Sequence, residues 1–151
     1  MLGAELLKIF MARAGVPQAA AEMLHTSGLE PMAVMVLIIV IFLVLGCLMD
    51  SLSMIILAIP FFWPVVSGLD FGLGPDETKL WFGIIILVVV ELGLITPPVG
   101  LNVFIINALA RDVRMRDTFK GVMPFFATEM VRITLLVLFP AISLTLPRLL
   151  Q

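Results

Sequence analysis

The chain of 151 residues is 62% hydrophobic and 13% charged, with a mean hydropathy of +1.20. About a quarter of the residues in an ordinary soluble domain are charged, so this composition excludes such a domain and predicts an integral membrane protein. A net charge of −2 leaves no basic surface for nucleic acid, and one Cys and one His exclude a disulfide framework and a zinc site built from several such ligands.

Residues 1–31 predict an amphipathic helix followed by a connector. Apolar residues recur from Leu2 at helical spacing, beside charged residues that would face water. The glycine and proline at Gly15 and Pro17 are expected to end this helix.

Residues 32–67 contain one charged residue, Asp50, and no polar face, which predicts a segment surrounded by lipid or protein. One helix of about 34 residues would be roughly 50 Å long, beyond a hydrocarbon core of about 30 Å, whereas two crossings need about 40 residues plus a turn. We therefore expect a re-entrant hairpin of two half-length helices, with its tip near Gly46 and Asp50. The alternative is one tilted or kinked span over residues 33–52, followed by an interfacial segment.

Residues 68–79 are rich in glycine and charged side chains and predict an outer loop at the water interface, with Asp76 placed to cap the next helix. Residues 80–110 predict a discontinuous transmembrane helix. Its break falls at the sequence GLITPPVG, residues 93–100, because each proline removes a backbone donor and disfavours helix at the preceding residue. The alternative is a simple proline kink filled by neighbouring side chains.

Residues 111–120 hold the basic cluster of the chain and are expected to form a cytoplasmic connector by the positive-inside tendency. Residues 121–151 predict a last transmembrane helix that runs to Pro147 and ends in a short tail. Glu129 and Arg132 lie three residues apart in this span and are expected to neutralise each other on one helical face. The expected fold class is therefore all-α and integral to the membrane.

The predicted break is the first candidate for a functional site. Unwound backbone at membrane depth offers carbonyl oxygens, and two half-helix ends bring partial charges to the same point. Carbonyl groups around Gly93 and the hydroxyl of Thr96 are candidate ligands for a small hard cation such as sodium, and Asn102 could donate to a substrate carboxylate. Asp50 could bind the cation or cap the returning helix, and both interpretations stay open. No Ser/His or paired-Asp arrangement indicates an enzyme.

The sequence ELGLITPPVGLN, residues 91–102, closely resembles the large membrane subunit of the TRAP transporters, the tripartite ATP-independent periplasmic (DctM-type) family. The similarity covers essentially the whole chain. It includes a Gly-x-x-x-Asp hairpin tip at Gly46 and Asp50, a returning arm that contains proline, the break and the basic connector. The family's large subunit is longer, so the chain is similar to its C-terminal third.

The resemblance implies a sodium-coupled secondary transporter in the bacterial inner membrane, which imports an organic anion such as a C4-dicarboxylate or sialic acid. A periplasmic binding protein would deliver the anion, and an elevator-like motion of a transport domain would move it. This chain would supply the second of two inverted repeats. The implied partners are the remaining N-terminal part of the large permease and a small membrane subunit, with sodium as the coupling ion and no other cofactor.

Carried over by position, the resemblance assigns two sets of residues. The set that would hold sodium is Gly46, Asp50, Gly93 and Thr96, and the set that would face the substrate is Thr96, Pro97, Pro98, Gly100 and Asn102. The other half of the pocket would lie in the first repeat, so the chain is expected to be incomplete alone. The alternative function is a non-transporting membrane scaffold or assembly subunit, or an inactive truncated fragment.

Overall fold

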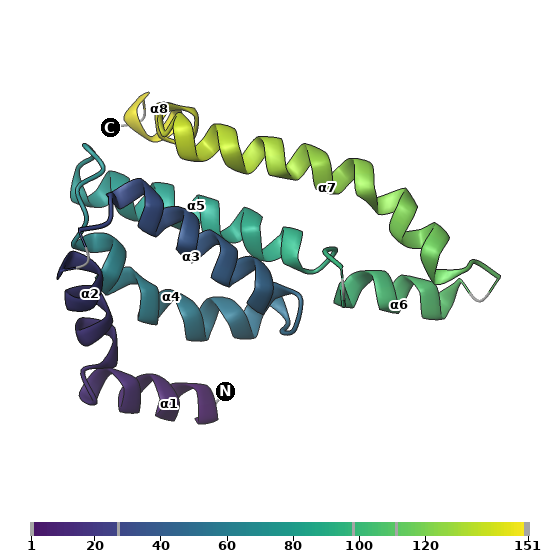
Figure 1. Cartoon of the computed structure of the whole chain (residues 1–151), viewed down its shortest axis with the longest axis horizontal. Coiled ribbons are helices and arrows are strands. Elements are labelled where there is room, and N and C mark those ends of the chain that lie inside the picture. Colours follow the sequence, from purple (N-terminus) through teal and green to yellow (C-terminus); the bar gives the residue numbers. More distant parts are fainter. Residues whose placement is uncertain (1, 27, 98, 111, 150–151) are drawn as a thin grey trace.

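The computed structural model describes residues 2–26, 28–97, 99–110 and 112–149, and every regular element in these ranges is an α-helix (Figure 1). The all-helical fold class predicted from the lengths and patterns of the apolar segments is therefore confirmed. In chain order the helices are α1 (Leu2–Arg13), α2 (Val16–Thr26), α3 (Pro31–Gly46), α4 (Ser51–Ser67), α5 (Pro75–Gly93), α6 (Leu101–Leu109), α7 (Met115–Leu138) and α8 (Ala141–Leu149).

The first two helices form an arm that packs against α4. Gly15 separates them with a φ of +68°, a left-handed conformation that glycine adopts without strain. A new helix starts at once, because Pro17 falls in its first turn, where the missing N–H of proline costs no helical hydrogen bond. Gly15 and Pro17 therefore end one helix and begin another, and much of the expected connector is helical.

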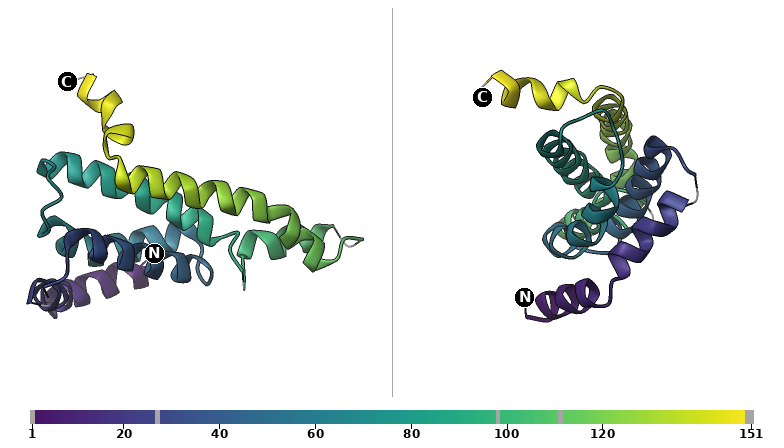
Figure 2. Two further views of the ribbon diagram at one scale, coloured as in Figure 1. Left: turned by 45° about the horizontal axis from the view of Figure 1, so that its top comes forward. Right: turned by 90° about the vertical axis from the view of Figure 1, so that its left-hand side faces the viewer.

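The helices α3 and α4 run antiparallel, side by side in both ribbon views, as a helical hairpin (Figures 1 and 2). They contain 16 and 17 residues, and residues 47–50 join them. The carboxylate of Asp50 accepts a hydrogen bond of 2.9 Å from the Ser53 backbone N–H and caps α4. The chain reverses direction here, so the alternative of one kinked span over residues 33–52 is wrong.

At the centre of the fold is α5, which packs against α3, α4, α7 and α8. It starts at Pro75, with Gly74 as its N-cap, and the Glu77 carboxylate accepts a hydrogen bond of 3.3 Å from the Gly74 N–H. The expected cap at Asp76 is wrong, because Pro75 is already suited to the first helical position and Glu77 provides the capping contact. Buried side chains on several faces explain why α5 shows no polar stripe beyond its first turn.

The last part of the chain is two helices, not the single span to Pro147 that the sequence predicted. With 24 residues, α7 is the one helix in the described ranges that is long and apolar enough to cross a membrane by length and composition. It starts at Met115, inside the expected connector. It stops at Leu138 because Pro140 disfavours helix at Phe139, whose φ and ψ are −126° and 76°.

A buried indole compensates for the helix end at Pro140. In a continuous helix the carbonyl of Leu136 would accept from the N–H of residue 140, which proline lacks. The indole N–H of Trp81 donates to this carbonyl instead, at 2.7 Å, and its side chain is fully buried. The contact fixes the end of α7 against α5 and supplies the missing donor.

The predicted pairing within α7 is confirmed. Arg132 and Glu129 approach to 3.0 Å on one helical face, where each reduces the cost of placing the other in the membrane.

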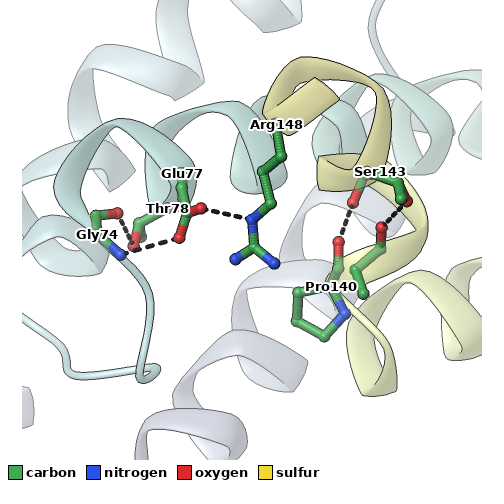
Figure 3. Close-up of polar contacts among 8 residues, drawn as sticks. Gly74, Glu77, Thr78, Pro140, Ser143 and Arg148 are labelled. Atoms are coloured by element: carbon green, nitrogen blue, oxygen red, sulfur yellow. Dashed lines mark hydrogen bonds and ion pairs between the residues drawn. The ribbon is translucent and has the colours of Figure 1, made fainter. Parts of the chain in front are cut away.

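The helix α8 folds back onto the start of α5 (Figure 3). Arg148 Nε donates to Glu77 Oε1 at 2.7 Å, while the other oxygen of this carboxylate accepts from Gly74. Leu144 is buried between the helices, with 1% of its surface exposed. The hydrogen bond from Arg148 lowers the pKa of the Glu77 carboxyl below its ordinary value.

We predict that Trp81→Phe lowers the free energy of unfolding by about 1–3 kcal/mol, because most of the ring remains but the buried Leu136 carbonyl loses its donor. Thermal unfolding in detergent measures the change. Trp63→Phe is the matched control, since the Trp63 indole packs near Phe82 and donates no hydrogen bond within the described residues. An equal effect of both substitutions would contradict this role of the indole N–H.

We predict that α8 loosens from α5 in acid. The pKa of Glu77 is lower in the folded state than its ordinary value of 4.5. The contribution of the ionised carboxylate to stability is therefore complete above pH 4.5, and it is lost as the pH falls through the lower pKa of the folded state. The rate of hydrogen exchange of the α8 amides is measured in the unaltered chain and in the Glu77→Gln variant at each pH. Comparing the two at the same pH cancels the intrinsic pH dependence of amide exchange. We expect slower α8 exchange in the unaltered chain than in Glu77→Gln at neutral pH, and equal exchange in acid. A difference in exchange rate that persists in acid would refute the prediction.

Candidate functional site

Two glycines bring the hairpin and the end of α5 into backbone contact. Gly46 is the last residue of α3 and Gly93 the last of α5, and both are buried. A Cβ built on Gly93 would lie 2.6 Å from the Gly46 Cα, and one built on Gly46 would lie 3.0 Å from the Gly93 Cα. Ordinary carbon contacts are about 3.5–4.0 Å, so no side chain fits between these backbones. The two parts of the chain predicted to hold sodium therefore meet at this point.

The break between α5 and α6 is an ordered turn with its own hydrogen bonds. Thr96 N–H donates to Gly93 O at 3.1 Å, and Asn102 N–H donates back across the break to Leu94 O at 3.1 Å. Gly100 has a φ of +53°, and a Cβ there would crowd neighbouring backbone at 3.3 Å. Helix stops at Gly93 and resumes at Leu101, so the alternative of a simple proline kink is wrong.

Thr96 connects the break to the hairpin. Its side chain is buried, with 8% of the residue exposed, and its hydroxyl donates to Leu92 O at 2.6 Å. The hydroxyl hydrogen is thereby occupied, which leaves the oxygen lone pairs as acceptors. The Thr96 carbonyl oxygen lies 3.6 Å from the Cys47 sulfur, a weak donor whose one thiol hydrogen has a closer acceptor in the Leu43 carbonyl at 3.3 Å. Thr96 thus presents two oxygen atoms that a cation could use.

Asp50 has a different environment. Its side chain is exposed and caps α4 through Ser53, so the geometry matches the capping interpretation of this residue. The structure brings Gly46, Gly93 and Thr96 together. Asp50 is joined to this group only by the connection between α3 and α4, which starts at Cys47.

The residues expected to face the substrate lie around the first turn of α6. Pro97 and Asn102 are exposed, so their side chains are accessible on this chain. Gly100 is buried, and a Cβ there would lie 3.4 Å from the ring of Phe119. Pro98 lies outside the described residues.

Sequence reasoning gave no role to two residues, one that the structure places at the break and one at the far end of α6. Cys47 contacts the Thr96 carbonyl, as described above. The carboxamide of Asn107, near the end of α6, donates to Val113 O at 2.9 Å and to Thr118 Oγ1 at 3.0 Å. The available signal was an Asn near the end of an apolar half-helix, followed by a Thr in the next helix.

An apolar cavity of about 520 Å³ lies between the α1–α2 arm and the hairpin. Its walls include Met11, Pro17, Met54 and Phe61. None of the candidate sodium or substrate residues that the structure describes lines it, and its surface suits hydrocarbon better than an ion. Within the described residues, no group of three or more His, Cys, Asp or Glu side chains could hold a metal ion.

An apolar all-helical chain with a broken helix packed against a hairpin has the architecture of a membrane transporter subunit. The sequence model of the tripartite ATP-independent periplasmic transporter family, DctM component, matches residues 1–142. The chain therefore belongs to this family, which confirms the resemblance seen in the sequence.

Curated relatives support the same assignment. The chain is 32% identical over 147 residues to the C4-dicarboxylate TRAP transporter large permease protein DctM of Rhodobacter capsulatus, covering 97% of this chain and 32% of that protein. It is 31% identical over 132 residues to the DctM protein of Pseudomonas aeruginosa, covering 87% and 29%. It is 28% identical over 149 residues to the sialic acid TRAP transporter large permease protein SiaM of Vibrio cholerae, covering 99% and 33%. The chain spans about a third of the length of these relatives, which are transporter permeases and not enzymes.

We predict that Gly93→Ala lowers the free energy of unfolding by about 1–3 kcal/mol, because the added methyl group meets the Gly46 backbone, which cannot rotate away. Gly83→Ala in the same helix is the control, since a Cβ there meets nothing within 4 Å. It should leave stability unchanged or raise it by up to about 1 kcal/mol. Thermal unfolding of both variants in detergent tests the contact, and equal stability would count against it.

Proposed function

We propose that this chain supplies one half of the transport site of a TRAP large permease, which imports an organic anion together with sodium across the bacterial inner membrane. The observation that carries the proposal is the break between α5 and α6, with its oxygen atoms held against the glycine contact of the hairpin. The hairpin is proposed to be re-entrant and the basic connector at residues 111–120 to be cytoplasmic.

The proposed sodium site contains Gly46, Asp50, Gly93 and Thr96. Sodium binds oxygen donors and tolerates neutral ones, and the Thr96 hydroxyl has already given its hydrogen to Leu92 O. The Thr96 carbonyl faces a thiol whose hydrogen lies closer to Leu43 O, so an ion would displace at most a weak hydrogen bond. Asp50 would contribute its negative charge at the hairpin tip while it keeps its cap on α4.

The proposed substrate is an organic carboxylate, the chemistry shared by the C4-dicarboxylate and sialic acid in the names of the relatives. The exposed amide of Asn102 can donate to a carboxylate, and the N-terminus of α6 adds a partial positive charge. Thr96, Pro97, Pro98 and Gly100 would form the wall of the pocket on this side.

The proposed partners complete the site. The relatives are about three times longer, so the rest of the large permease would supply the opposite half of the pocket. A small membrane subunit and a periplasmic binding protein would assemble with it and deliver the anion. The hairpin and the broken helix would move together in an elevator-like step, since their backbones are in direct contact.

We predict that Thr96→Ala abolishes sodium-dependent uptake in liposomes that contain the complete permease, made from this chain and the rest of the large subunit with the small subunit and binding protein. The change removes an oxygen ligand that no neighbouring side chain replaces. Thr134→Ala is the control, because the Thr134 hydroxyl also bonds a carbonyl four residues earlier but lies exposed on α7. Uptake by Thr96→Ala equal to the control would remove Thr96 from the site. Absence of uptake by the unaltered complex would instead favour a non-transporting subunit.

A further inference from the structure

We infer that Asn107 is a positioning residue that fixes the direction of α6, and with it the substrate-facing end of that helix, by tying α6 to α7. The transport part of this inference rests on the proposed function. The structural part rests on the contacts of Asn107 alone.

Both hydrogens of the Asn107 carboxamide are directed at α7 and the segment before it. One bond reaches the carbonyl of Val113 at 2.9 Å and the other reaches Thr118 Oγ1 at 3.0 Å, in the first turns of α7. The hydroxyl of Thr118 lies 3.5 Å from the Arg114 carbonyl, which orients its lone pairs toward Asn107. One side chain therefore joins the end of α6, the connector and the start of α7.

Among the residues that the structure describes, little else holds α6. It has nine residues, a length at which an isolated helix is marginal, and Val103 is its one buried residue. Among the described helices it packs chiefly against α7, and Figure 1 shows α6 and the start of α7 beyond the end of the hairpin. Four large apolar side chains of α6 remain exposed, namely Phe104, Ile105, Ile106 and Leu109.

The two ends of α6 are attached to different parts of the fold. At its start, the Asn102 N–H bonds Leu94 across the break, and at its end Asn107 bonds the α7 side. Without Asn107 the packing of α6 on α7 loses the hydrogen bonds that fix its end, and α6 can tilt about the Asn102 bond. Asn102 and Asn107 are separated by about 7 Å of helix, so a tilt at the end of α6 misdirects the Asn102 amide. The Gly46–Gly93 contact lies before the break and is unaffected by that tilt.

The test compares Asn107→Ala and Thr118→Val with Thr134→Val in the complete permease. Thr118→Val keeps the side-chain shape and removes the acceptor, whereas Thr134→Val removes a hydroxyl bonded only within α7. We expect the α6 amides to exchange hydrogen faster in the first two variants than in the unaltered protein. In the control, Thr134→Val, their exchange rate should not change. The substrate concentration for half-maximal uptake should rise about three- to tenfold in Thr118→Val, the range for loss of one hydrogen bond. It should rise at least as much in Asn107→Ala, which loses two, with the sodium dependence unchanged in both variants. The double variant should be no worse than Asn107→Ala.

Unchanged exchange of α6 in both variants would overturn the inference, and so would faster exchange with an unaltered substrate dependence. An equal rise in the sodium and substrate concentrations needed for half-maximal uptake would also overturn it. The Asn107 hydrogen bonds would then affect the whole site and not only its substrate-facing end. If Asn107→Ala does not fold, Thr118→Val decides the question. If the unaltered complex shows no uptake, the proposed function fails, while the exchange of α6 still decides whether Asn107 holds the helix.

Discussion

The backbone contact between Gly46 and Gly93 sets the geometry of everything around it. Because neither residue has a side chain, α3 and α5 end against each other, and the turns that follow each helix are forced into the same small space. That is why the Cys47 thiol reaches the Thr96 carbonyl, although the two residues belong to different halves of the fold. Side chains of ordinary size would hold the helices apart and separate the hairpin from the break.

Prolines create backbone carbonyls without donors in this chain, and the structure satisfies them in different ways. The Leu136 carbonyl, freed by Pro140, receives the buried Trp81 indole N–H. The Leu94 carbonyl receives the Asn102 N–H from across the break. The Thr96 carbonyl, which no proline frees, faces a thiol that also lies near Leu43 O, and a thiol is a weaker donor than an N–H or O–H group. Among the described residues of the break, the Thr96 carbonyl is therefore paired less strongly than the Leu94 carbonyl.

The sequence predicted the features that arise from local physical chemistry. A run of 36 residues with one charge, and a cluster of two prolines and two glycines, predicted a hairpin and a break, with a kinked span and a simple proline kink as the alternatives. The return of α8 onto Glu77 and the tie from Asn107 to Thr118 were not predictable in this way. Each joins residues whose proximity follows from packing and leaves no periodic pattern. The end of α7 was visible as Pro140, but the strongly apolar residues on both sides favoured one continuous span.

The glycine contact also limits how this protein can change over evolutionary time. In an ordinary core, a gain of volume at one position can be offset by a smaller residue at its neighbour, so pairs of positions drift together. Gly46 and Gly93 have no such route, since no amino acid is smaller than glycine and a Cβ at either position meets main-chain atoms of the other. Compensation would have to come from a shift of a whole helix, which would displace every group that the contact aligns.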